Sequence, residues 1–289
     1  MVKHNRTTYA EVKQACIDER FFAYNDWRDK LFVPPSFFLV WLFVKLNWSG
    51  NAVSWLSGCV TILGGILLTS RNHFLVLLGS LSYILFYYLD YVDGGVARYR
   101  KTSGIGGQYT DWIMHVISSV SISSGIFVGA FASTGSYWLV PFGLLYILAS
   151  ILQWDRFSMG WWSICMYRQQ HQCKGIACEF TGKDAATSVK HKTRSYFFWK
   201  LIRIASTLLF HENYMIFHLP LLAVFAVVVP GHLPDFRIVL TVLGGSMYFL
   251  FVIHEIVQIS SNRRLDAAYN RLFDIADKPD LPDDHFIRS

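Results

Sequence analysis

The chain has 289 residues, of which 53% are hydrophobic and only 16% charged, and its mean hydropathy is +0.32. This composition excludes an ordinary soluble domain, in which about a quarter of the residues are charged, and it predicts a multi-pass integral membrane protein. The net charge of +6 predicts no nucleic-acid partner, because basic residues are expected where a membrane protein faces anionic lipids.

The first 46 residues are predicted to stay outside the hydrocarbon core. Residues 1–30 are polar and contain no signal peptide, while Tyr9, Val12 and Cys16 recur at helical spacing and predict an amphipathic cytoplasmic helix. Residues 33–46 are apolar but contain two prolines and Lys45. Because this stretch is too short to cross a bilayer, we predict that it lies along the membrane interface.

Six apolar stretches follow, each close to the roughly 20 residues that a spanning helix needs. They cover residues 51–70, 73–91, 108–131, 137–157, 214–230 and 237–259. A polar segment at about 158–212 is predicted to form a cytoplasmic loop or hairpin, and residues 261–289 a cytoplasmic tail. The sequence therefore predicts an all-α integral membrane fold, with one domain of six transmembrane helices over residues 47–260 after the interfacial segment 1–46.

The positions of the basic residues predict the orientation of these helices. With the N-terminus in the cytoplasm, every Lys and Arg of the chain except Arg71 and Arg237 falls on the cytoplasmic side. Such an asymmetry sets the orientation of most multi-pass proteins. We therefore expect both termini, and the junction between the second and third predicted helices, to face the cytoplasm.

Acidic residues gather at this junction. Asp90 and Asp93 are three residues apart, and Asp111 and His115 are four apart, so each pair lies on one face of its helix. A carboxylate near hydrocarbon is costly unless it is paired or bound to a metal. Carboxylates suit hard cations such as Mg²⁺ or Mn²⁺, which accompany phosphate esters and pyrophosphates. The junction therefore indicates a cation site that opens to the cytoplasm.

The spacing of residues around this junction resembles a known signature. Asp90-x2-Asp93-Gly94-x2-Ala97-Arg98-x8-Gly107-x3-Asp111-x3-His115 is similar to the motif of the CDP-alcohol phosphotransferases, integral membrane enzymes of phospholipid synthesis. Seven of the eight fixed positions of this 26-residue motif are present. At the eighth position the chain has His115 where the family has a fourth aspartate, which serves there as metal ligand and catalytic base.

The resemblance implies an activity and a set of partners. It implies transfer of a phosphoalcohol group from a CDP-alcohol donor to an acceptor hydroxyl, with release of CMP. It also implies a homodimer in the lipid bilayer, and two cations, Mg²⁺ or Mn²⁺, held by Asp90, Asp93 and Asp111 with His115 as a further ligand. The catalytic residues would be Asp111 and His115.

Three roles are open for His115. A neutral imidazole accepts a proton near neutral pH, so His115 is a candidate general base. It is also a candidate supporting residue in an enzyme that takes its base from elsewhere. In the third reading the protein is a catalytically inactive relative. The cost of keeping three buried carboxylates without a metal argues against that reading.

The resemblance also implies a nucleotide pocket built from small and polar residues: Asn51, Ser54, Gly94, Ala97, Arg98 and Gly107. The two glycines and the alanine leave room for a base or ribose, or alternatively allow close helix packing. The guanidinium of Arg98 makes a bidentate hydrogen bond to a phosphate, or alternatively anchors the helix at the cytoplasmic face. The asparagine and serine line the pocket, or cap the first spanning helix.

A rival function remains open at the level of the sequence. Carboxylates inside a membrane also mark ion pathways, so a transporter or channel is the alternative to an enzyme. The sequence shows no internal repeat of the kind that many transporters have, and its acidic residues crowd at one cytoplasmic edge. Both observations favour the enzyme.

Overall fold

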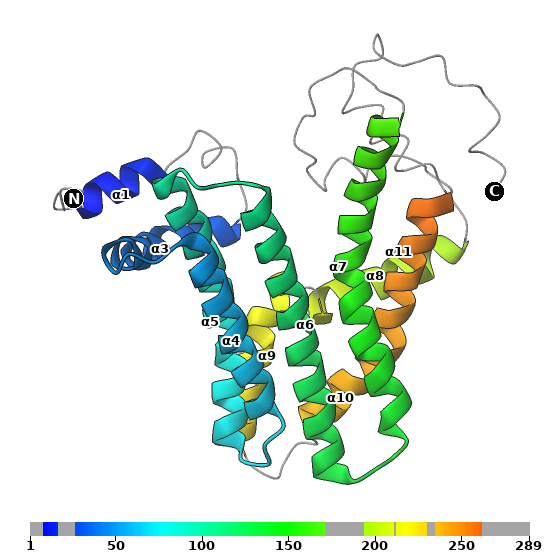
Figure 1. The fold of residues 1–289 in the computed structure, drawn as a ribbon. Coiled ribbons are helices and arrows are strands. Elements are labelled where there is room, and N and C mark those ends of the chain that lie inside the picture. Colours follow the sequence, from blue (N-terminus) through cyan, green and yellow to red (C-terminus); the bar gives the residue numbers. More distant parts are fainter. Residues whose placement is uncertain (1–7, 17–26, 171–193, 211, 230–234, 262–289) are drawn as a thin grey trace.

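The computed structural model of the protein describes residues 8–16, 27–170, 194–210, 212–229 and 235–261, and over these residues it consists of helices and short connections. The helices are α1 (Tyr9–Cys16), α3 (Trp27–Lys45), α4 (Gly50–Leu68), α5 (His73–Arg100), α6 (Ile105–Thr134), α7 (Leu139–Gln170), α8 (Arg194–Phe210), α9 (Glu212–Val228), α10 (Phe236–Leu243), the π-helical turn η2 (Gly244–Tyr248) and α11 (Phe249–Ser261) (Figure 1). The predicted all-α fold is confirmed.

In the part of the chain that the structure describes, four helices are long and apolar enough to cross a membrane. They are α4, α5, α6 and the continuous run Phe236–Ile259 through α10, η2 and α11. Helices α8 and α9 add a fifth if they form one bent span, while the apolar part of α7, Leu139–Trp154, is shorter. The described residues therefore contain four or five helices capable of spanning a membrane, and the predicted number of six stays a prediction.

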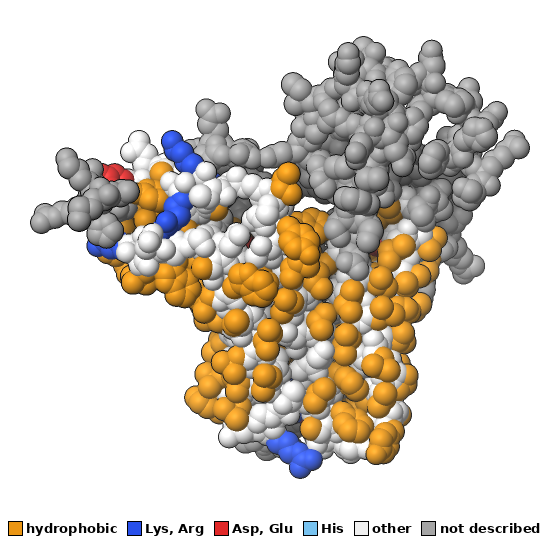
Figure 2. All heavy atoms as spheres, viewed as in Figure 1, with side chains coloured by type: hydrophobic (Ala, Val, Ile, Leu, Met, Phe, Trp, Pro, Cys, Tyr) orange, Lys and Arg blue, Asp and Glu red, His pale blue; other side chains and the backbone are white. Residues whose placement is uncertain are grey.

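The surface of the bundle matches a lipid environment. Hydrophobic side chains cover the flank of the helices, and Lys and Arg side chains lie at the two ends of the bundle (Figure 2). On α4, for example, Trp55, Leu63 and Ile66 are each more than half exposed. Large apolar side chains in such numbers are unfavourable in water but not in hydrocarbon.

Small residues on α4 allow it to pack closely against both α5 and α6. A side chain at Gly64 would collide with Ser82 and the backbone of Gly79 on α5. On the adjacent face, Gly65 lies against Gly125 of α6, with no space for a Cβ atom at either position. Close backbone approach through small residues is the common way that membrane helices associate. This packing fixes where the end of α5 and the start of α6 meet.

Helices α1 and α3 lie across one end of the bundle (Figure 1). Phe37, Val40 and Phe43 of α3 are buried in one cluster with apolar residues of α4 and α5. The Cys16 thiol of α1 donates to the backbone carbonyl of Gly95 on α5 at 3.3 Å. Burial raises the pKa of this thiol above its ordinary value. The transverse position fits the predicted interfacial segment, and the described end of α11 lies at the same end of the bundle.

Two segments differ from the expected boundaries. Helix α5 continues nine residues beyond the predicted end at 91 and stops at Arg100, where Lys101 adopts a left-handed backbone with φ of 56°. The first half of the motif is therefore entirely helical. The segment 158–212, expected as a loop or hairpin, contains the end of α7 and all of α8. Its residues 171–193 lie outside the described residues, as does the predicted tail from 262 onward.

The opposite end of the bundle contains a buried ion pair. Arg237 is only 2% exposed, and its guanidinium donates to the carbonyls of Leu68 at 2.6 Å and Ser70 at 2.7 Å and pairs with Asp235 at 2.7 Å. Burial by itself raises the pKa of Asp235, but the hydrogen bonds and charge of Arg237 outweigh it and hold this pKa below its ordinary value. The arginine therefore ties the end of α4 to the start of α10.

Candidate metal centre and adjoining pocket

Asp90 of α5 meets Asp111 and His115 of α6 at the end of the bundle where α3 lies. The Nε2 atom of His115 is 3.0 Å from Asp90 Oδ1 and 3.7 Å from Asp111 Oδ1. One ligand atom from each of the three residues lies within 4.8 Å of the other two. We call these three residues the cation group.

The cation group fits a metal ion. Ligand oxygens and nitrogens lie about 2.0–2.6 Å from common divalent ions, so atoms up to about 5 Å apart can bind the same ion. The three ligand atoms satisfy this limit. The donors are two carboxylates and one imidazole, which divalent ions of the first transition row accept. The spacing of four between Asp111 and His115 predicted that their side chains would converge, and this prediction is confirmed.

Aromatic rings surround the imidazole of His115, and only 11% of its side chain is exposed. The ring of Phe86, on α5, meets the imidazole edge to face, with centroids 5.2 Å apart and an interplanar angle of 87°. The indole of Trp154, on α7, lies 4.4 Å away at an angle of 30°. The imidazole is therefore held between rings from two different helices.

Asp93 does not belong to the cation group. Its Oδ2 accepts a hydrogen bond of 2.5 Å from the hydroxyl of Ser54 on α4, and the residue is 9% exposed. A step of three residues in a helix leaves two side chains about 60° apart, so Asp90 faces α6 whereas Asp93 faces α4. The expectation that Asp93 binds a metal together with Asp90 and Asp111 stays a prediction.

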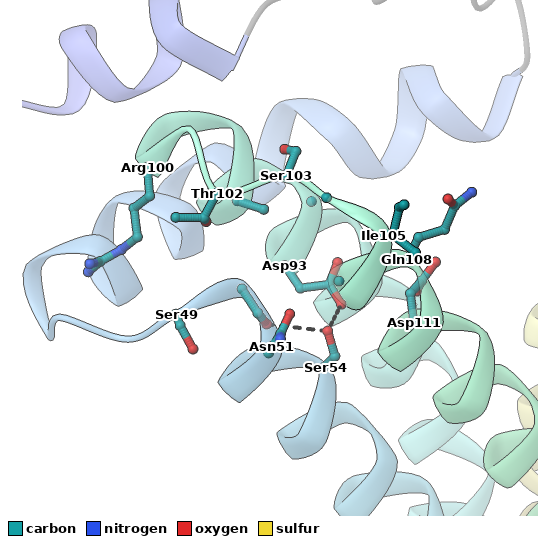
Figure 3. Close-up of a pocket in the computed structure, with 15 residues that line it drawn as sticks. Ser49, Asn51, Ser54, Asp93, Arg100, Thr102, Ser103, Ile105, Gln108 and Asp111 are labelled. Atoms are coloured by element: carbon teal, nitrogen blue, oxygen red, sulfur yellow. Dashed lines mark hydrogen bonds between the residues drawn. The ribbon is translucent and has the colours of Figure 1, made fainter. Parts of the chain in front are cut away.

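A pocket of about 700 Å³ opens beside the cation group (Figure 3). Its walls come from the first turns of α4 and α6, the last turns of α5 and the connection between α5 and α6. The lining residues are Ser49, Gly50, Asn51, Ser54, Asp93, Gly94, Ala97, Arg100, Thr102, Ser103, Gly104, Ile105, Gly107, Gln108 and Asp111. Since Asp111 belongs to both the lining and the cation group, the two features form one continuous site.

Most of the predicted nucleotide residues come together in this pocket: Asn51, Ser54, Gly94, Ala97 and Gly107. The small residues have different surroundings. A Cβ atom at Gly107 would lie at an ordinary contact distance of 3.5 Å from the Asn51 side chain, whereas one at Gly50 would lie 3.0 Å from the Asp93 carbonyl and 3.1 Å from the Cβ of Ala97, because α4 packs closely on α5 there.

Arg98, which the resemblance assigns to a phosphate, does not line the pocket, whereas Arg100 does. Arg98 is exposed and does not line the pocket; its guanidinium lies over Gly94, 3.1 Å from where a Cβ atom would stand. Arg100 lines the pocket and donates to Asn47 Oδ1 at 3.0 Å, while its buried Nε has no hydrogen-bond partner among the described residues. Both arginines lie in the last turn of α5, and which of them faces the pocket depends on how that helix ends.

Arg100 and the N-terminus of α6 suit the pocket to anions. The first turns of α4 and α6 both line the pocket; the Ser49 side chain caps α4 by accepting from the backbone N–H of Ala52, whereas Gly104, the N-cap of α6, provides no side-chain cap for the first backbone N–H groups. Helix N-termini carry partial positive charge and bind phosphates. The pocket thus has a positive end at Arg100 and a negative end at Asp93 and Asp111.

No protein-family model and no curated protein matches this chain. The resemblance to the CDP-alcohol phosphotransferases therefore depends on the motif at residues 90–115 and on the site that these residues form.

Proposed function

We propose that this protein is a membrane enzyme that transfers a phosphoalcohol group from a CDP-alcohol to an acceptor hydroxyl and releases CMP, in phospholipid or lipid-linked head-group synthesis. One observation carries the proposal. Five residues that the family resemblance assigns to the nucleotide line one pocket, and this pocket shares Asp111 with a group able to hold a metal ion.

The pocket supports binding of a nucleotide diphosphate. Its small residues admit the base and ribose, while Arg100 and the two helix N-termini suit phosphate oxygens. Asp90, Asp111 and His115 would hold Mg²⁺ or Mn²⁺, and Asp93 would contribute to a second ion. When bound, such ions neutralise the charge that develops on the leaving phosphate and orient it for in-line displacement.

The chemistry that we propose requires one new bond and one broken bond. The acceptor oxygen attacks the phosphorus that carries the alcohol, the bond to the bridging pyrophosphate oxygen breaks, and CMP leaves with the electron pair. We assign the imidazole of His115 to the ion, because Nε2 is the atom that approaches both carboxylates. We assign uptake of the acceptor proton to Asp111, since it belongs to both the cation group and the pocket.

The proposed topology follows the sequence. Helix α7 and the bent pair α8 and α9 would complete six spans, with both termini and the pocket on the cytoplasmic side, where nucleotide-activated donors are made. The pocket lies at the end of the bundle that α1 and α3 cross, as expected if these helices rest at the cytoplasmic interface (Figure 1). The homodimer remains an expectation from the resemblance.

The experiment that tests the function measures CMP. Purified protein in lipid nanodiscs is given a panel of CDP-alcohols, including CDP-diacylglycerol, CDP-choline, CDP-glycerol and CDP-inositol, with acceptor alcohols and either Mg²⁺ or Mn²⁺. We expect CMP release with at least one donor and none after chelation of divalent ions. Ion flux in sealed vesicles without CMP release from any donor would instead favour the transporter.

A further inference from the structure

The environment of His115 contains a residue that the motif does not include. Trp154 comes from α7, outside residues 90–115, and its indole lies 4.4 Å from the imidazole at an angle of 30°. Its Nε1 donates to the hydroxyl of Ser119 at 2.8 Å. Ser119 is one helical turn beyond His115 on α6, so the indole is fixed to the same helix that carries the imidazole.

A histidine ring needs this kind of restraint to serve as a ligand. The χ2 torsion of histidine is broad and roughly two-fold, so a free ring also turns its carbon edge toward the carboxylates. Phe86 and Trp154 meet the imidazole from two helices, at angles of 87° and 30°. In this orientation Nε2 lies toward Asp90 and Asp111.

We infer that Trp154 is a positioning residue of the cation group, which holds Nε2 of His115 at the two carboxylates and so keeps a nitrogen among the ligands of the ion. A nitrogen ligand raises affinity for Mn²⁺ relative to Mg²⁺, because Mg²⁺ strongly prefers oxygen. This inference rests on the cation site of the proposed function but not on the phosphotransfer reaction. It makes α7 part of the site.

The test uses Mn²⁺ as a paramagnetic probe of the full-length protein in nanodiscs. Pulsed electron paramagnetic resonance of the wild type should show the coupling of a directly bound ¹⁴N, which His115→Ala removes. Trp154→Leu should weaken that coupling and lower Mn²⁺ affinity roughly tenfold to a hundredfold, the usual cost of losing a group that orients a ligand. Mg²⁺ affinity, measured by competition, should change less.

Two further variants separate positioning from general damage. Ser119→Ala leaves both rings in place and removes the hydrogen bond to the indole, so we expect a smaller loss of Mn²⁺ affinity in the same direction. Trp55→Leu makes the same substitution on the exposed face of α4 and should leave the ¹⁴N coupling unchanged. If Trp154→Leu does not fold, Ser119→Ala alone decides the question.

The outcomes distinguish this inference from the proposed function. Unchanged ¹⁴N coupling and unchanged Mn²⁺ affinity in both Trp154→Leu and Ser119→Ala overturn the positioning role. Mn²⁺ bound to the wild type without ¹⁴N coupling overturns it as well, and a wild type that binds no Mn²⁺ overturns it together with the cation site. A third outcome separates the two proposals: the wild type shows the ¹⁴N coupling, Trp154→Leu loses it, and the wild type releases no CMP from any donor. This outcome would support the positioning role and reject the phosphotransfer.

Discussion

The two ends of the helix bundle handle buried charge in opposite ways. At one end Arg237 donates to two backbone carbonyls and to Asp235, so that one buried cation is matched within the fold. At the other end Asp90 and Asp111 lie together with side chains that are 24% and 39% exposed. Charge matched inside the protein stabilises the fold, whereas like charge gathered beside a pocket is available to a cation.

The same helices connect the two ends. The carbonyls at the end of α4 accept from Arg237, and the carbonyl of Ala132, near the end of α6, accepts from Arg71 at 2.6 Å. The N-termini of α4 and α6 open into the pocket. Each of these helices thus has its negative end matched by an arginine and its positive end at the pocket, where Ser49 caps α4 and α6 has no side-chain cap.

The largest effect is expected at the end of the bundle where Arg237 pairs with Asp235, which we call the matched end. Arg237→Met removes the guanidinium that pairs with Asp235 and donates to two carbonyls, and we expect it to lower the free energy of unfolding by about 3–5 kcal/mol. Unfolding by denaturant in mixed micelles measures the change. Arg71→Met removes an arginine that is exposed and should cost less than about 1 kcal/mol. Equal losses in the two variants would contradict the distinction between the buried and the exposed arginine at this end of the bundle.

The next effect concerns the carboxylates at the pocket end. Asp111→Asn should lower the rate of CMP release by roughly a hundredfold or more, the usual scale for loss of a residue that acts on the reacting groups. The variant should unfold at the same denaturant concentration as the wild type or a higher one, because one of several like charges has been removed. Glu11→Gln on α1 makes the same chemical change away from the site and serves as the control. Full turnover in Asp111→Asn would remove this residue from the mechanism.

The two arginines at the end of α5 give a smaller and more specific comparison. Arg100→Gln should weaken binding of a CDP-alcohol about tenfold, the loss expected for one charge-assisted hydrogen bond to phosphate. Arg98→Gln should have less effect because Arg98 lies outside the pocket. Equilibrium binding of a fluorescent CDP analogue measures both affinities. The reverse order of effects would support the role that the family resemblance gives to Arg98.

The smallest effect is a dependence of stability on pH at the matched end. The pKa of Asp235 is lowered in the fold, so its stabilising contribution is complete above its unfolded pKa of about 3.9 and is lost as pH falls toward the lower folded value. Below about pH 4 the wild type should therefore lose more unfolding free energy than Asp235→Asn does. Parallel curves for the two proteins would show that Asp235 does not contribute to this loss.

The sequence predicted the parts of the site that depend on local helix geometry. Asp111 and His115 converge because four residues make about one turn, and the resemblance grouped Asn51, Ser54, Gly94, Ala97 and Gly107, which line one pocket. The expectation that Asp90 and Asp93 share one face of α5 is wrong, because Asp90 meets α6 and Asp93 meets α4, and this separation depends on which helix packs on each side. The place of Arg100 depends on the left-handed ending at Lys101, and the place of Trp154 depends on the packing of α7 against α6. Neither leaves a pattern in the sequence.

The short connection between α5 and α6 has a consequence for how the protein is made. Only residues 101–104 separate the two helices, so Asp90 and Asp111 belong to one antiparallel hairpin whose closure costs little chain entropy. Synthesis proceeds from the N-terminus, and the hairpin is complete before α7 emerges from the ribosome. We therefore expect the two carboxylates to meet early in membrane insertion, and Trp154 to reach them only when the second half of the bundle arrives.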